Sequence, residues 1–311
     1  MSGEYITAFR EIGCDRSARS MLIHSFSKLL LIMILLGGLG MGYLQAQSLL
    51  VPMDRQQQNH LRAYGLAYWT LEQGEKAEWL LNYRGGSFLL PDLPSVRREA
   101  AYRGVSITGV DAPAEARIRA TIEGTNMEAV PLEQAPKVAI YTPPNSTPWD
   151  DAVTMVLEYA GIPYETIWDY EVLEGDLSEY EWIHLHHEDF TGQYSKFYLT
   201  YAGAPWLQEE VARNQEVARA GDFADVPELK KHIALKIRTY VENGGFLFAM
   251  CSATETLELA LAAFSVDIAA AYSDGTPPDA NATSKLDWVA SMAFENADVQ
   301  IAPSINAFSD I

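Results

Sequence analysis

One cysteine stands where the sequence pattern allows chemistry. Cys251 lies in GGFLFAMCSATETLEL, where an apolar run passes directly into a helical pattern. Ala249 and Ala253, on either side of it, are small, as a tight turn from strand to helix requires. A thiol at a helix N-terminus is favoured as thiolate by the free N–H groups there. The spacing therefore predicts a reactive cysteine, with a buried and inert thiol as the alternative.

Three histidines and two acidic residues gather in the run HLHHED. Alternation along a strand places His184 and His186 on one face and His187 on the other. Two imidazoles with a carboxylate from Glu188 or Asp189 suit Zn²⁺, which makes a metal-dependent hydrolase one alternative. The run only roughly resembles the HxHxDH pattern of metallo-β-lactamases. We expect no metal or other cofactor, and lining of a pocket or plain packing are the rival interpretations.

Strands and helices alternate after residue 136, which positions these side chains. Near-continuous apolar strands separated by helices predict an α/β fold, a parallel sheet with helices on both faces. Strands are expected at 137–142, 162–169, 180–188 and 245–250, and helices at 150–161, 206–220 and 226–243.

The carboxyl ends of parallel strands form one edge, where ligands usually bind. The loops PPNSTPW, HHEDFTG and MCSAT are expected to meet there and form a pocket. Thr147, Trp149 and Ser252 are the expected binding residues. Nearby aromatic residues predict either a sugar or peptide platform or a packed insert: Trp149, Trp168, Tyr194, Phe197, Tyr198, Tyr201 and Trp206.

A small α+β accessory region is expected over residues 47–135. Its predicted helices cover 56–73 and 93–103, its predicted strands cover 77–83, 87–91 and 105–110, and PLEQAP at 131–136 is the predicted linker. Arg84 beside two glycines suggests an anion site, although a two-glycine turn is the commoner interpretation.

Residues 136–264 resemble the class I glutamine amidotransferase-like superfamily. The resemblance rests on LSEYEWIHLHHED, TYVENGG and FLFAMCSATETLELAL. It implies a flavodoxin-like fold, with Cys251 as the nucleophile and the following backbone N–H groups as oxyanion donors. The superfamily's downstream His-Glu pair is missing, since no histidine follows His232. A branch of the superfamily pairs its cysteine with a carboxylate from another strand-end loop, which makes Glu188, or else His186, the expected assistant.

The N-terminal segment predicts export from the cell. Residues 29–41 form an apolar run shorter than the roughly 20 residues of a membrane span, and Ala46 precedes a plausible cleavage point. We expect residues 1–46 to be a signal segment with Met21 as the true start, an uncleaved anchor being the alternative. The mature protein would then be periplasmic or secreted, without a stable membrane span. Cys251 would be its only cysteine, unable to form an internal disulfide.

Composition and motifs limit the classes of partner and activity that fit this sequence. A net charge of −20 argues against nucleic acid as a partner. We expect an amide or peptide hydrolase, degenerate or of unidentified activity, with an unknown small-molecule or peptide ligand. The alternative is a non-catalytic module that binds cell-envelope glycans or peptides. Residues 265–311 form an extension with too few strand-like runs to complete the sheet, which suggests truncation.

A further resemblance concerns the segments LLVPMD and LLNYRGGSFLLP. They resemble exported bacterial chains described as asparagine synthetase B. The residues do not support that chemistry, because the enzyme needs an N-terminal catalytic cysteine and an SGGxDS run. Ser2, or Gln47 after cleavage, stands at the N-terminus, and SGGxDS does not occur in the sequence.

Overall fold

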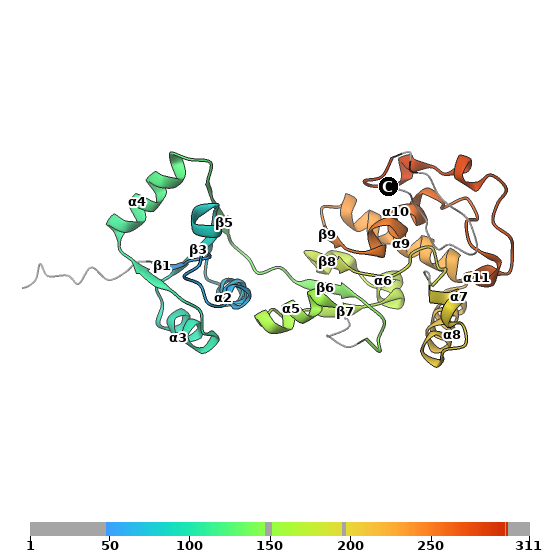
Figure 1. Cartoon of the computed structure of the whole chain (residues 1–311), viewed down its shortest axis with the longest axis horizontal. Helices are drawn as coiled ribbons and strands as arrows, with labels where there is room; N and C mark the ends of the chain where they lie inside the picture. Colours follow the sequence, from blue (N-terminus) through green and yellow to red (C-terminus); the bar gives the residue numbers. More distant parts are fainter. Residues whose placement is uncertain (1–47, 147–150, 195–196, 296, 298–311) are drawn as a thin grey trace, which may run out of the picture.

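A computed structural model describes residues 48–146, 151–194, 197–295 and 297. Two lobes, each with its own sheet, are joined by an extended segment (Figure 1). The expected signal segment lies outside the described residues. None of the helices within the described ranges combines the length and apolar composition that crossing a bilayer requires.

The first lobe is built on an antiparallel sheet. Its strand order is β4-β1-β3-β2-β5. The strands are β1 (Ser48–Val51), β2 (Ala77–Leu81), β3 (Ser87–Pro91), β4 (Thr108–Val110) and β5 (Glu128–Leu132), and the helices are α2 (His60–Glu72), α3 (Pro94–Arg103) and α4 (Ala112–Glu123), with a 3₁₀ turn at Tyr83–Gly85. Successive side chains of β1 face opposite ways: Leu49 packs toward α2 and α3, and Leu50 toward α4.

The expected linker is partly wrong. Pro131 and Leu132 belong to β5, where Pro131 pairs with Glu78 of β2. Proline is tolerated there because β5 is an edge strand and an edge backbone need not donate on its outer side. Helix α4 was also not expected, although Asp111 signals its start by accepting a hydrogen bond from the N–H of Ala114 at 2.9 Å.

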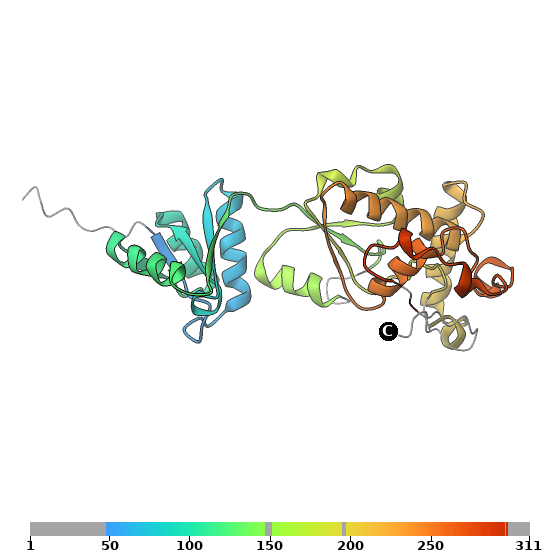
Figure 2. The same cartoon turned by 90° about the horizontal axis from the view of Figure 1, so that it is seen from above.

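The second lobe holds a parallel sheet with helices on both faces, as the sequence predicts. The strand order is β7-β6-β8-β9. Figure 2 shows this lobe from above, with one of its helices beside the first lobe. The strands are β6 (Val138–Tyr141), β7 (Glu165–Ile167), β8 (Trp182–Leu185) and β9 (Phe246–Ala249). The helices are α5 (Ala152–Ala160), α6 (Asp169–Glu174), α7 (Phe197–Tyr201), α8 (Pro205–Ala220), α9 (Val226–Glu242), α10 (Ser252–Ala262) and α11 (Ala271–Asp274), with 3₁₀ turns at Leu177–Glu179, Ala282–Lys285 and Trp288–Ala290.

The pleat of β6 divides the core of this lobe in two. Val138 and Ile140 pack with Leu157 of α5 on one face. Ala139 and Tyr141 join the larger core on the other face, to which α6, α8, α9 and α10 contribute. Because every residue of β6 is buried, its sequence is continuously apolar rather than alternating.

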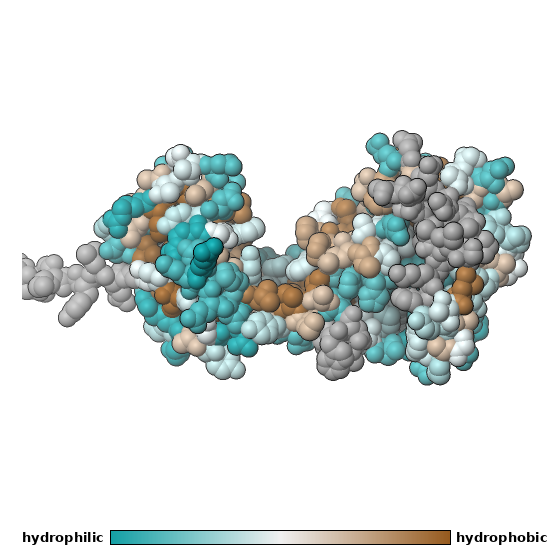
Figure 3. All heavy atoms as spheres, viewed as in Figure 1, coloured by the Kyte–Doolittle hydropathy of each residue, from teal (hydrophilic) through white to brown (hydrophobic). Residues whose placement is uncertain are grey.

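The lobes meet where α2 crosses α5. A Cβ on Gly65 of α2 would lie 1.8 Å from the carbonyl oxygen of Ala160, so only glycine allows this approach. Arg103 donates to the same oxygen at 2.6 Å, and Asn59 donates to the hydroxyl of Tyr159 at 2.8 Å. Hydrophobic atoms gather over α5 in the space between the lobes (Figure 3).

The Gly65→Ala variant tests this contact. Alanine favours a helix by about 1 kcal/mol over glycine, but here its methyl group would push α2 off α5, and we expect a net loss of about 1–3 kcal/mol in unfolding free energy. Gly203→Ala is the control, because a Cβ there meets nothing within 4 Å. Urea unfolding measures both, and a Gly65→Ala chain more stable than the native one would contradict the contact.

Candidate functional site

Cys251 occupies the sharp turn between β9 and α10, as the sequence predicts. It is exposed and stands at the N-cap of α10 with φ 52° and ψ −139°. A non-glycine residue in such a conformation costs about 1–3 kcal/mol, and strain of this kind is common at functional sites. The turn therefore holds the thiol in a conformation that local backbone preference alone would not select.

The loop after β8 packs against the first turn of α10. Ser252 donates from its hydroxyl to the carbonyl of His187 at 2.9 Å, and the N–H of Ala253 donates to the carbonyl of His186 at 3.2 Å. Thr256 donates to the carbonyl of Glu188 at 3.0 Å. These bonds bring the cysteine turn and the HHED run together at one edge of the sheet. The hydroxyl of Ser252, one of the expected binding residues, holds the loop.

Glu188 is the most perturbed carboxyl at this edge. Burial raises its pKa to about 7, against the lowering effect of hydrogen bonds from backbone N–H groups and of the Lys230 charge. The His186 N–H donates to it at 3.1 Å. A carboxyl with this pKa exchanges its proton near neutrality, as an acid–base catalyst must. Within the described residues, no hydrogen bond joins Glu188 or His186 to Cys251.

His184 and His186 share one face of the strand end, as expected, and both meet Asp151. The Nδ1 of His186 lies 2.9 Å and the Nε2 of His184 lies 3.4 Å from one Asp151 oxygen. The other Asp151 oxygen accepts from the N–H groups of Val153 and Thr154, which caps α5. The cluster thus ties β8 to α5, and burial lowers the pKa of His184.

No set of three or more His, Cys, Asp or Glu side chains is placed to hold a metal ion within the described ranges. Thr147 and Trp149, two of the expected binding residues, lie outside those ranges.

A cavity of about 280 Å³ opens at the same edge, over the ends of β6, β7 and β8. Its wall combines strand-end loops with α8 and α9; it is lined by Pro143, Asn145, Ser146, Trp168, His187, Glu188, Asp189, Gly192, Tyr194, Trp206, Glu210, Arg213, Asn214, Val226 and Lys230. The MCSAT loop, expected to help form a pocket at this edge, does not line this cavity. The loop after β8 both packs on the first turn of α10 and lines the cavity.

A buried ion pair forms the floor of the cavity. Lys230 donates to both oxygens of Asp169 at 2.8 Å and to the hydroxyl of Tyr141 at 3.0 Å, while that hydroxyl donates to Asp169. The ammonium also lies 4.1 Å from the centre of the Trp168 ring. This pair is not among the residues expected from the sequence, although a lysine at an apolar position of an amphipathic helix is a signal for it.

Aromatic residues of the expected platform have different surroundings in the structure. Trp168 is buried against Tyr141, with ring centroids 4.6 Å apart. Tyr198 stacks on Tyr272 at 4.2 Å. Trp206 is half exposed and lines the cavity.

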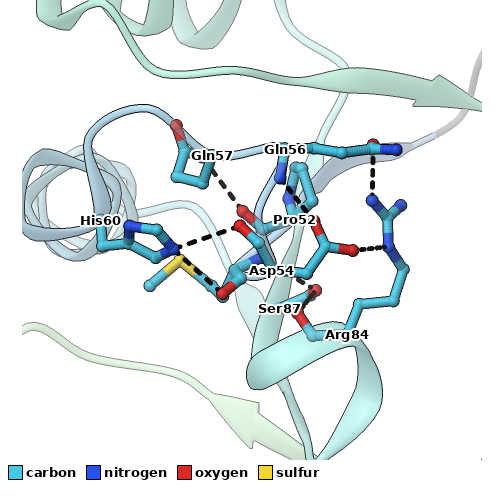
Figure 4. Close-up of polar contacts among 8 residues, drawn as sticks. Pro52, Asp54, Gln56, Gln57, His60, Arg84 and Ser87 are labelled. Atoms are coloured by element: carbon cyan, nitrogen blue, oxygen red, sulfur yellow. Dashed lines mark hydrogen bonds and ion pairs between the residues drawn. The ribbon is translucent and has the colours of Figure 1, made fainter.

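Arg84 is already paired and does not form the suggested anion site. Its Nε donates to Asp54 at 2.7 Å and its Nη2 to Gln56 at 2.6 Å (Figure 4). The Arg84 hydrogen bond lowers the pKa of Asp54. The cluster closes the loop after β1, and a Cβ on Gly85 would lie 2.5 Å from the Met53 carbonyl oxygen.

Comparison with models of protein families, with curated proteins and with solved structures found no match for this chain.

The Glu188→Gln variant tests the buried carboxyl through pH. Because the folded-state pKa is raised from 4.5 to about 7, the folded chain keeps a proton that the unfolded chain releases, and native stability from this group falls as pH rises through that window. Glutamine does not ionise, so the stability of the variant does not fall with pH for this reason. We expect its unfolding free energy, relative to the native chain, to rise by up to about 3 kcal/mol between pH 5 and pH 8. Parallel stability curves for the two chains would contradict the burial of this carboxyl.

Backbone strain at Cys251 has its own test. Glycine adopts positive φ freely, so we expect Cys251→Gly to be about 1–2 kcal/mol more stable than Cys251→Ala. At the exposed helical position Thr254, the glycine variant should instead be about 1 kcal/mol less stable than the alanine variant. Chemical denaturation of the four variants measures both differences. If the alanine variant is the more stable one at position 251 as well as at position 254, Cys251 is not strained.

Proposed function

We propose that this chain is an exported cysteine-dependent amide or peptide hydrolase of the class I glutamine amidotransferase-like superfamily. The conformation of Cys251, exposed at positive φ between a parallel strand and a helix, carries the proposal. The strand order β7-β6-β8-β9 supports it, because in chain order it corresponds to 2-1-3-4, the beginning of the flavodoxin-like order. Export to the periplasm or beyond is supported by the apolar run at 29–41.

The proposed reaction begins with attack of the Cys251 thiolate on an amide carbonyl carbon. The carbonyl oxygen becomes an oxyanion, for which the N–H of Ser252 is the expected donor, because the N–H groups of Ala253 and Thr254 already bond protein carbonyls. Collapse of this intermediate breaks the C–N bond, and the leaving amine takes a proton. Water then hydrolyses the thioester, releasing the acid and restoring the thiolate.

Glu188 is the proposed proton carrier. In its protonated form it gives a proton to the leaving amine, and as carboxylate it removes one from the attacking water. Its raised pKa supports both roles near neutral pH. Since no hydrogen bond reaches Cys251 from Glu188 within the described residues, the proton would pass through a water molecule or the substrate. His186 is the alternative, although its Nδ1 is engaged by Asp151.

Reactivity of the thiol is the direct test. We expect iodoacetamide to alkylate Cys251 in folded residues 47–311 about tenfold faster at pH 7 than in the same chain unfolded in urea, because a cysteine that serves as a catalytic nucleophile is more reactive than an ordinary thiol. Mass spectrometry follows the rate, and free cysteine in both solvents corrects for urea. If the folded chain reacts no faster than the unfolded one, the thiol is not activated and the hydrolase proposal is wrong.

A second candidate function is non-catalytic binding of cell-envelope glycans or peptides. Its support is the half-exposed Trp206 at the rim of a cavity that Cys251 does not line. Aromatic rings suit the apolar faces of sugars and peptides. Failure of the native chain to bind such ligands would remove this candidate while leaving the hydrolase untouched.

A further inference from the structure

The cavity lies where parallel α/β sheets usually bind ligands. The chain leaves β6 for β7 on one side and returns to β8 on the other, so the ends of these strands surround a topological switch point. The volume of about 280 Å³ is close to the lower limit of small-molecule sites. It therefore suits a compact ligand.

Two buried polar groups on the cavity wall have no partner within the described residues. Asn214 is 3% exposed; its Nδ2 donates to the Glu210 carbonyl at 2.9 Å, whereas its Oδ1 accepts nothing. Trp168 is 6% exposed, and its Nε1–H donates to nothing. Leaving such groups unmet costs about 1–3 kcal/mol each. Neither atom is exposed to solvent in this structure, so a ligand with a donor for Asn214 and an acceptor for Trp168 would satisfy both once these side chains turn toward it.

The charges around the cavity favour a cation. Lys230 contributes no free charge, because its three protons go to the two Asp169 oxygens and the Tyr141 hydroxyl. Arg213 also lines the cavity, where it keeps its positive charge and donates to the neutral Oδ1 of Asn145 at 2.6 Å. Three carboxyl groups also line the wall: Glu188, Asp189 and Glu210.

We propose that this cavity binds a small amino alcohol or amino sugar. Its ammonium group would donate to Asn214 Oδ1 beside the carboxyl groups, its hydroxyl oxygen would accept from Trp168 Nε1, and its carbon skeleton would lie against Trp206. This inference rests on the proposed binding function and names its ligand class. It does not require Cys251.

Ligand charge and carboxyl ionisation should be linked. Burial raises the pKa of both Glu188 and Glu210. The charged or titratable groups acting on Glu188 are Lys230, Asp151 and Tyr141; those acting on Glu210 are Lys230, His187, Arg213 and Asp189. A bound ammonium favours ionised carboxylates. Binding of ethanolamine, whose amine stays protonated over this range, should therefore tighten as pH rises from 6 to 8.

Calorimetry with matched probe pairs tests the proposal on folded residues 47–311. The probes are D-glucosamine and ethanolamine at pH 7, each paired with its N-acetyl form, which keeps the hydroxyl groups but loses the positive charge. We expect each amine to bind at least about tenfold more tightly than its acetylated partner, the loss of one charge-assisted hydrogen bond. Cys251→Ala should bind like the native chain.

Variants on α8 locate the site. Asn214→Leu should weaken amine binding about tenfold or more, whereas Gln215→Leu, at the adjacent exposed position, should not. If Asn214→Leu fails to fold, Glu210→Gln serves instead, and it should weaken the amines but not the acetylated probes.

The outcomes separate the two levels of the proposal. Equal binding of amines and acetylated probes would overturn the ligand class and keep the binding function. Binding of none of the four probes at 10 mM would overturn the inference, and binding unaffected by both Asn214→Leu and Glu210→Gln would place the ligand elsewhere.

Discussion

The docking of the β8 loop onto the first turn of α10 is the contact on which both proposed sites depend. Hydrogen bonds from Ser252, Ala253 and Thr256 to three successive carbonyls hold residues 186–188 in place. One side of the loop then supports the cysteine turn, and the other forms a wall of the cavity. Without these donors, the backbone carbonyls of the loop would lack hydrogen-bond partners at the carboxyl edge of the sheet. A buried carbonyl without a partner costs free energy.

Glu188 links the two sides of that loop. Its backbone carbonyl bonds Thr256 of α10, while its side chain lines the cavity and accepts from the backbone of His186. A carboxyl whose pKa is raised to about 7 suits acid–base chemistry, and it equally suits a site that exchanges a proton for a cationic ligand. Both proposals therefore use the same physical property, the poor solvation of a buried charge.

At the cavity floor, in contrast to Glu188, two buried charges neutralise each other. Lys230 and Asp169 are buried together and saturate each other's hydrogen bonds, with Tyr141 completing the set. Such a pair is costly to desolvate and gains little net stability. Its consequence here is geometric: it fixes α9 against the ends of β6 and β7, and it leaves the wall carboxyl groups without a free cation from Lys230.

Much of the second lobe was predictable because its signals are local. The apolar runs gave the strands β6 to β9, the junction of apolar run and helical pattern gave the cysteine turn, and strand alternation placed His184 and His186 on one face. In the first lobe, Pro131 misled the prediction, since only the position of β5 at the sheet edge makes a proline acceptable there.

The amino-acid sequence by itself determined where strands pass into helices and which side chains share a face, because those features repeat over two to four residues. Tertiary structure alone decided that Asp151 joins the two histidines, that Lys230 meets Asp169, and that Cys251 lies outside the cavity. These pairings join residues that are far apart in the chain. Packing of helices on the sheet selects them, and no local pattern encodes that packing.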